Sequence, residues 1–155
     1  MNASLLVRTY IRFFAPKWTV GSLALLQASD GRICLAKHRG RVKPWGLPGG
    51  LIKWPESASE GLVRELQEEL GLQLPAHDFQ CLETLSSPKL PLLEILYKCR
   101  RIFSSDEIGK IKPCSPEVIE LRWILSSEVE GFEMLERHRN ILRSLEPGAP
   151  FEKVR

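Results

Sequence analysis

Three glutamates share one side of a segment with helical spacing. Glu65, Glu68 and Glu69 are three and four residues apart, so a helix places them within about a third of its circumference. Like charges at this spacing repel one another by roughly 0.2–0.5 kcal/mol per pair. A hard divalent cation relieves the repulsion, because magnesium binds carboxylate oxygens together with substrate phosphates. The alternative interpretation is a solvated acidic face, since glutamate is also a good helix former.

The helix that would carry these glutamates has signals at both ends. Ser57 and Glu60 form the S-x-x-E pattern of a capping box, and Gly71 supplies the stop. Between them an apolar stripe recurs every four residues, as expected of a face turned toward a core. Its members are Leu62, Leu66 and Leu70, with Val63 beside them. The sequence therefore predicts a helix over residues 58–70.

A longer pattern surrounds the glutamates. Gly50 is followed by five residues and Glu56, and seven more residues lead to Arg64-Glu65-Leu66. One residue then separates this triplet from Glu68-Glu69, and one more separates that pair from Gly71-Leu72. The pattern resembles the complete Nudix box, with every fixed position matched from Gly50 to Leu72. So many fixed positions make it far more specific than a lone glycine-rich loop.

The resemblance implies a fold and an activity. The expected fold is α/β, a Nudix-like mixed β-sheet sandwiched between helices. The expected enzyme is a pyrophosphohydrolase acting on acid anhydrides, with Mg²⁺ as cofactor and Mn²⁺ as a substitute. Its substrate would be a small-molecule nucleotide, a nucleoside diphosphate linked to another moiety, as in a nucleotide sugar, ADP-ribose or a nucleoside triphosphate. The products would be a nucleoside monophosphate and a phosphorylated remainder.

The same resemblance gives roles to individual positions. Glu68 and Glu69 are the expected main metal ligands, and Glu65 is a further ligand or a base. The carbonyl of Gly50 is an expected backbone ligand. The remaining pair of the motif, Arg64 and Glu56, is expected to lock the loop onto the helix and so support the site.

One position departs from the family pattern. Pro55 precedes Glu56, where many family members have glycine, and proline fixes φ and removes a hydrogen-bond donor. We expect it to reshape the loop that carries Lys53 and Trp54. The metal site should remain, because its ligand positions are intact.

The family does not hold its general base in one place, so three candidates stay open. Glu65 is one. Glu117, six residues before Trp123, has a placement similar to that of a functional glutamate in several family members, and Glu120 is the third. For Glu117 and Glu120 the alternative is an exposed charge at a strand edge.

Residues that would contact the substrate are less well marked. A basic run before the glycine loop either holds terminal phosphates or simply keeps a loop soluble. It consists of Lys37, His38, Arg39, Arg41 and Lys43, and Lys37, Arg39 and Arg41 are the candidate contacts. Among aromatic side chains Trp54 is the candidate, while Phe13 and Trp18 are weaker ones for stacking a base. Trp45 and Trp123 are expected in the core.

Prolines give a slight indication of substrate. Pro88 lies sixteen residues beyond Leu72, and a proline there resembles family members that act on ADP-ribose. The tyrosine that marks many diadenosine polyphosphate hydrolases is absent. Pro88 and Pro91 also suit an ordinary loop between strands.

The composition is that of one globular domain. The 155 residues carry a net charge of +3 from 22 basic and 19 acidic side chains, which excludes the dense positive face of a dedicated nucleic-acid binder. We therefore expect no long nucleic acid as partner. The four cysteines form no C-x-x-C pair and indicate reduced thiols; they are Cys34, Cys81, Cys99 and Cys114. No apolar run reaches the length of a membrane span, and a cytoplasmic location is expected.

The chain divides into three expected parts: an N-terminal apolar and basic extension (1–16), a Nudix hydrolase domain (17–147) and a C-terminal tail (148–155). Strands are expected over 19–26 and 32–37, joined as a hairpin at Asp30-Gly31, and over 79–85, 92–103 and 118–125. Residues 45–50 should be a loop. A second helix should begin after Ser126 or Ser127 and end at Pro147-Gly148.

The extension has two interpretations. It packs on its own domain or on a second copy of the chain, which makes a homodimer an expected state, or it lies as a basic amphipathic segment on a membrane or a partner. Two further functions stay open beside the small-molecule hydrolase. One is a catalytically weak nucleotide-sensing module, against which the intact carboxylates argue. The other is an RNA 5'-end pyrophosphohydrolase, which should show a basic groove interleaved with aromatic residues.

Overall fold

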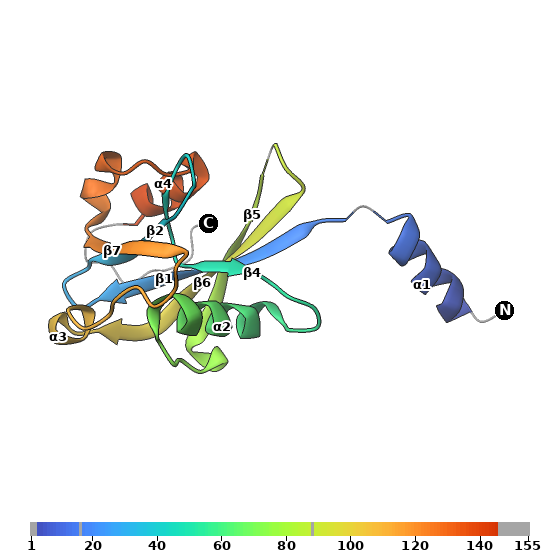
Figure 1. Cartoon of the computed structure of the whole chain (residues 1–155), viewed down its shortest axis with the longest axis horizontal. Coiled ribbons are helices and arrows are strands. Elements are labelled where there is room, and N and C mark those ends of the chain that lie inside the picture. Colours follow the sequence, from blue (N-terminus) through green and yellow to red (C-terminus); the bar gives the residue numbers. More distant parts are fainter. Residues whose placement is uncertain (1–2, 16, 88, 146–155) are drawn as a thin grey trace.

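A seven-stranded mixed sheet with helices on both faces forms the body of the protein (Figure 1). The computed structural model describes residues 3–15, 17–87 and 89–145 of the chain. The strand order is β3-β2-β1-β6-β5, with β4 paired to β1 and β7 paired to β2. The elements are α1 (Ala3–Phe13), β1 (Thr19–Ala28), β2 (Ile33–His38), β3 (Trp45–Gly46), β4 (Gly49–Leu51), α2 (Ala58–Leu70), η1 (Ala76–Asp78), β5 (Phe79–Ser86), β6 (Leu92–Phe103), α3 (Ser105–Ile108), β7 (Val118–Ile124), η2 (Ser126–Gly131) and α4 (Glu136–Arg143).

Strand β1 shares its side chains between two cores, because successive residues of a strand point to opposite faces. Leu23 and Leu25 belong to a cluster that includes Ile141 and Leu142 of α4. Ala24, Leu26 and Ala28 belong to a second cluster with the leucines of α2, which are Leu62, Leu66 and Leu70. The expected sheet between helices is therefore confirmed, and β1 is its central strand.

The predicted strands are present, and so is the antiparallel contact of β1 with β2 across Asp30-Gly31. There the amide of Ala28 donates to the Arg32 carbonyl over 2.8 Å, and Gln27 pairs with Ile33. The longest pairing of β1, however, is parallel, with β6 from Thr19–Leu92 to Ala28–Phe103. Local patterns cannot predict this pairing, because its two strands are far apart in the chain.

Residues 45–50 are not the plain loop that the turn formers predicted. Trp45 and Gly46 form β3 against β2, and the stretch from Gly49 to Leu51 forms β4 against β1. Gly49 has a φ of 132°, and a Cβ atom there would lie 2.2 Å from the carbonyl oxygen of Ser22. The glycines therefore allow β4 to lie close against β1, which turn-forming residues alone do not indicate.

The prediction that the second helix is one continuous element is also wrong. A 3₁₀ helix, η2, begins at Ser126, the chain then extends, and α4 begins only at Glu136. The extended stretch is held because Met134 bridges to Trp45 and the amide of Trp45 donates to the Glu133 carbonyl over 3.1 Å. The predicted end at Pro147-Gly148 and the tail lie outside the described residues. Two short helices, η1 and α3, were not predicted.

The N-terminal extension forms a helix, α1, that stands apart from the sheet (Figure 1). Its apolar side chains from Leu6 to Phe14 are exposed and belong to neither core cluster. The expectation that this segment packs on its own domain is therefore not met. Among the residues that the structure describes, no helix has the length and apolar character needed to cross a membrane.

Candidate active site

Helix α2 positions the three glutamates and begins and ends as predicted. The Ser57 side chain accepts from the amide of Glu60, and the Glu60 carboxylate accepts from the amide of Ser57 over 2.8 Å. Gly71 ends the helix in the left-handed conformation, with a φ of 67°. Because Leu62, Leu66 and Leu70 are buried under the sheet, the rotation of the helix about its axis is fixed. The opposite side, with its carboxylates, faces β4 and a cavity.

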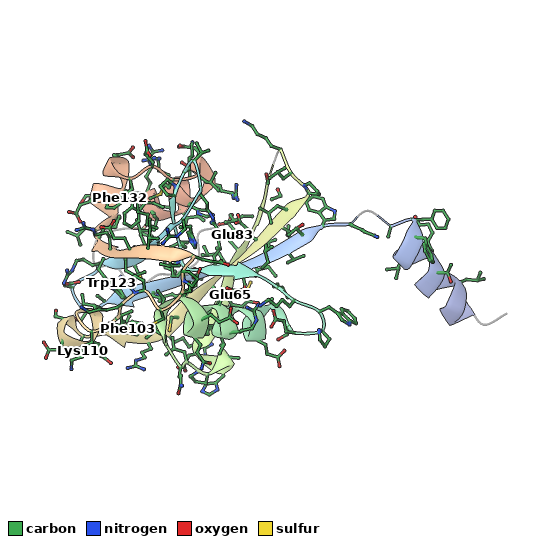
Figure 2. The ribbon with its side chains drawn as sticks, viewed as in Figure 1. Glu65, Glu83, Phe103, Lys110, Trp123 and Phe132 are labelled. Carbon is green, nitrogen blue, oxygen red and sulfur yellow. The ribbon has the colours of Figure 1, made fainter. Side chains whose placement is uncertain are left out.

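The three carboxylates have unequal surroundings. Glu68 is exposed, Glu65 is half-buried and lies between α2 and β4 (Figure 2), and Glu69 is buried with 4% of its surface accessible. One oxygen of Glu69 accepts from the amide of Gly49 over 3.0 Å. The other lies 3.7 Å from Nδ1 of His38, which is also buried. Sequence patterns indicated Glu69 but gave no sign that His38 would face it.

Burial decides the charge of this pair. It raises the pKa of Glu69 to about 7, against the opposing hydrogen bond from Gly49, and the nearby Glu65 and Glu117 raise it further. Burial also lowers the pKa of His38 to about 4, with the charge of Arg41 acting in the same direction. His38 is therefore neutral at pH 7, and its contact with Glu69 is not an ion pair. A bound cation would supply the missing positive charge.

Arg64 holds the loop onto the helix as predicted. Its guanidinium contacts both carboxylate oxygens of Glu56 over 2.7 and 3.0 Å and donates to the Leu51 carbonyl over 3.0 Å. The hydrogen bonds from Arg64 and from the Lys53 amide lower the pKa of Glu56 to about 2. Arg64 also donates to Glu65 over 2.6 Å, which fixes that carboxylate. The loop before α2, with a cis Trp54–Pro55 peptide, keeps this pairing intact.

Gly50 brings the strand directly against Glu65. A Cβ atom at this position would lie 2.6 Å from the carboxylate carbon of Glu65, so any side chain there would displace this carboxylate. The carbonyl oxygen of Gly50 lies 3.3 Å from where a Cβ of Gly21 would be and so rests against β1. Its role as a backbone ligand stays a prediction.

A cavity of about 1170 Å³ opens beside these groups. Its acidic lining comes from Glu65, Glu68, Glu69, Glu94, Glu117 and Glu136. Its basic lining comes from Arg41, Lys43, Lys53, Lys89 and Arg137. Carboxylates for a cation and basic side chains for phosphate oxygens therefore meet in one space, which is large enough for a nucleotide.

Of the candidate substrate contacts, only Arg41 lines the cavity. Lys37 points to Glu120, with the two charged groups 3.6 Å apart, and its ammonium lies over the Trp45 ring. Arg39 donates to the Pro116 carbonyl over 3.0 Å. Trp54 is 97% exposed. The basic run thus divides by position: Lys37 lies in β2, whereas Arg39 and Arg41 lie in the loop that follows it.

The aromatic residues divide in a similar way. The predicted core residues are half-buried: Trp45 packs edge-on to Phe132, and Trp123 packs against Phe103 (Figure 2). Neither Phe13 nor Trp18 lines the cavity. Pro88, whose position suggested ADP-ribose, lies outside the described residues.

The three candidate bases also differ in their position relative to the cavity. Glu117, at the start of β7, lines the cavity with Glu65. Glu120 lies outside the cavity lining and pairs with Arg122 over 2.6 Å as well as with Lys37. Glu65 and Glu117 are thus brought together, and Glu120 is not.

One polar group in the cavity was missed entirely. Glu94 of β6 is 9% exposed, contacts Arg137 over 2.5 Å and lies 3.5 Å from Nε2 of His138. Burial opposes the charge of Glu94, but His138 and Arg137 outweigh it and lower its pKa to about 2. Among the described residues, neither ring nitrogen of His138 has a hydrogen-bond partner. The residues are 43 and 44 positions apart, so no local motif signals them.

The donor set fits a hard divalent cation. The carboxylates of Glu65, Glu68 and Glu69 are oxygen donors, and the buried one lacks a counter-charge. Among the described residues, however, no group of three or more acidic, histidine or cysteine side chains is arranged so that it could hold a metal ion.

The family model described as NUDIX domain matches residues 17–145. The chain belongs to the Nudix family. A MutT-like protein of Streptomyces ambofaciens is 24% identical over 114 residues, which is 74% of this chain and 68% of that protein. An RNA pyrophosphohydrolase of Teredinibacter turnerae is 45% identical over 49 residues, but the match covers 32% of this chain and 29% of that protein.

The Nudix fold is equally clear among solved structures. The Nudix domain of Shewanella oneidensis NrtR, complexed with ADP-ribose, superposes with a TM-score of 0.68 at 18% identity. The superposition covers 92% of this chain and 96% of that one. The predicted family, fold and enzyme class, a Nudix-type pyrophosphohydrolase, are thereby confirmed. Nudix hydrolases generally use divalent metal ions, which agrees with the carboxylate set described above.

Proposed function

We propose that this Nudix protein uses Mg²⁺ to hydrolyse a phosphoanhydride bond in a nucleoside diphosphate linked to another moiety. The substrate is of the nucleotide sugar, ADP-ribose or nucleoside triphosphate type. A nucleoside monophosphate and a phosphorylated remainder are the products, and Mn²⁺ substitutes for Mg²⁺. The observation that carries the proposal is the shared cavity, in which Glu65, Glu68 and Glu69 meet Arg41 and Lys43.

The chemistry rests on position and charge. Glu68 and Glu69, with Glu65, would hold the cation, which when bound neutralises phosphoryl oxygens and makes water a better nucleophile. The water oxygen bonds to phosphorus, the anhydride P–O bond breaks, and the leaving phosphate takes its electron pair. A carboxylate accepts the proton of the water. Glu117 suits this task, because Glu65 already accepts from Arg64.

The other residues position these groups. Arg64 and Glu56 hold the loop and the helix together, so that β4 and α2 keep their separation. The Gly49 amide holds Glu69 in place, and the buried His38 lies beside it. Arg41 and Lys43 would contact the phosphates remote from the cation. Glu94 offers a hydrogen-bond acceptor to a donor on the nucleoside or its attached group.

A second candidate is removal of pyrophosphate from an RNA 5' end. It is favoured by the 45% identity to the RNA pyrophosphohydrolase, although that match spans 49 residues. The same carboxylates would serve, since the bond cleaved is again a phosphoanhydride. Against it, the structure lines the cavity with basic residues but places no exposed aromatic side chain among them.

The test is a hydrolysis panel with Mg²⁺, with Mn²⁺ and with EDTA. It contains nucleoside triphosphates, nucleotide sugars, ADP-ribose, dinucleoside polyphosphates and a 5'-triphosphorylated RNA, and the products are resolved by chromatography. We expect metal-dependent release of a nucleoside monophosphate from one small-molecule class. Turnover of the RNA alone would favour the second candidate. Tight nucleotide binding without turnover of any substrate would favour a sensor module.

Glu69→Gln tests the metal site within this panel. The variant keeps the size and the Gly49 contact but removes the ligand charge, so kcat should fall by about 100-fold or more. The melting temperature should not fall, because a neutral amide suits a buried site. The matched control is Glu83→Gln, which removes an exposed carboxylate of β5 outside the cavity and should leave kcat unchanged. Equal kcat for Glu69→Gln and wild type would reject the metal assignment.

A further inference from the structure

Helix α1 exposes a continuous apolar surface. Leu6, Val7, Tyr10, Ile11 and Phe14 are each between 52% and 73% exposed. At 100° per residue they occupy a single arc of about 140°, about two-fifths of the helix circumference. Water is a poor solvent for so large a contiguous apolar surface, so we expect this arc to be covered by a binding partner.

The body of the protein does not supply that occupant. None of the α1 side chains that the structure describes belongs to either core cluster, and the helix stands away from the sheet (Figure 1). The connection to β1 runs past Trp18, which is itself 51% exposed. Trp18 is therefore a further exposed apolar side chain between the helix and the sheet.

The charge of the N-terminal segment indicates the chemical nature of the surface that binds it. Residues 1–29 contain Arg8, Arg12 and Lys17 but no aspartate or glutamate, and the first acidic residue is Asp30. Basic residues beside an apolar arc match a surface that is apolar inside and negative outside. A bilayer with anionic lipids is such a surface, because its headgroups attract lysine and arginine while its hydrocarbon accepts apolar side chains.

We propose that α1 docks this enzyme reversibly onto anionic membranes, lying in the plane of the bilayer surface. An 11-residue helix extends about 16 Å, too short to cross the hydrocarbon, so it lies along the interface. Tyr10 and Trp18 suit the headgroup level, where amphipathic aromatic rings gather. A single short helix gives weak binding that salt reverses. The proposal is independent of the substrate and of the metal.

The experiment is co-flotation of the full chain with lipid vesicles. One set contains phosphatidylcholine alone, and the other contains phosphatidylcholine with phosphatidylglycerol. We expect the bound fraction to be at least about tenfold higher on the anionic vesicles at low salt, and to fall when salt is raised. Equal binding to both sets, or binding to neither, overturns the proposal.

Two pairs of variants assign the effect to α1. Ile11→Ser removes part of the apolar arc and should lower anionic-vesicle binding several-fold, whereas Ile102→Ser removes an exposed apolar residue of β6 and should not. The double variant Arg8→Gln/Arg12→Gln should lower it further, whereas Arg100→Gln, an exposed arginine of β6, should have little effect. The melting temperature should be unchanged by the α1 substitutions, which separates docking from folding.

A second copy of the chain is the rival occupant. Sedimentation velocity without lipid distinguishes it: the docking proposal expects a monomer at assay concentration, unchanged by Ile11→Ser. A dimer that Ile11→Ser dissociates would show that the apolar arc serves self-association and would overturn the membrane proposal.

Discussion

Helices α1 and α2 are nearly equal in length, 11 and 13 residues, and both are amphipathic. In α2 the apolar stripe is buried beneath the sheet and the polar side carries the carboxylates. In α1 the apolar arc faces outward. The same amphipathic pattern therefore has two uses: it fixes the position of a catalytic face, or it offers a surface for something outside the fold.

The difference follows from what surrounds each helix. Helix α2 has a capping box at its start, a left-handed glycine at its end and an arginine clamp to the preceding loop. These contacts set its place to within the tolerance that metal chemistry requires. Helix α1 lacks such connections among the described residues, and its sequence contains only basic charges. Helix α2 is thus held rigidly, whereas the apolar arc of α1 is accessible to a binding partner.

Truncation of one leucine in each helix gives the largest expected contrast. Leu66→Ala empties a fully buried site in α2 and should lower the free energy of unfolding by about 3 kcal/mol. Leu6→Ala in α1, where the side chain is 52% exposed, should change it by less than about 0.5 kcal/mol. Urea unfolding measures both. A comparable loss for Leu6→Ala would mean that α1 packs on the domain in solution.

Replacement of the clamp arginine should affect activity more than folding. Lysine cannot contact both oxygens of Glu56 and the Leu51 carbonyl together, so Arg64→Lys should loosen the loop and lower kcat by about 10- to 100-fold. The measurement is kcat on the substrate found in the panel, beside the melting temperature.

The matched control is Arg101→Lys, in which the arginine pairs with Glu107 of α3 away from the cavity. Its kcat should equal that of wild type. If Arg64→Lys also retained wild-type kcat, activity would not depend on the contacts that only arginine can make at this position.

Elements held by contacts between residues close in sequence could be predicted, and elements held by contacts between distant residues could not. The limits of α2 followed from Ser57, Glu60 and Gly71, because a capping box and a left-handed stop are satisfied within one helical turn. The break before α4 did not follow, because Trp45 holds Met134 from another part of the chain. Strand β4 escaped detection for the same reason, since it pairs with β1 from much earlier in the chain. Strand β3 pairs with the neighbouring β2 but is only two residues long.

The candidate site shows the same division. Glu65, Glu68 and Glu69 share one helix, so spacing alone placed them together. Glu94 and His138 come from β6 and α4, and the parallel pairing of β1 with β6 and the packing of α4 bring them to the cavity. His38 comes from β2 and lies beside Glu69. Spacing also could not separate Arg41, which lines the cavity, from Arg39, which binds the Pro116 carbonyl.

The smallest expected effect is a pH dependence confined to the attachment of α2. Glu56 has a pKa of about 2 in the folded protein, below its ordinary value of 4.5, because Arg64 and the Lys53 amide stabilise its charge. A carboxyl with a depressed pKa stabilises the fold above its unfolded value and loses that contribution as pH falls toward its folded value. The contribution of Glu56 should therefore be complete above about pH 5 and vanish near pH 2.

Thermal unfolding of wild type and Glu56→Gln between pH 2 and pH 7 measures this contribution. The wild-type melting temperature should exceed that of the variant at pH 7, and the gap should close as the pH falls through this window. Ile11→Ser in α1 is the comparison, and its small difference from wild type should not vary with pH. A gap for Glu56→Gln that stays constant down to pH 2 would show that the charge of Glu56 does not hold the loop to α2.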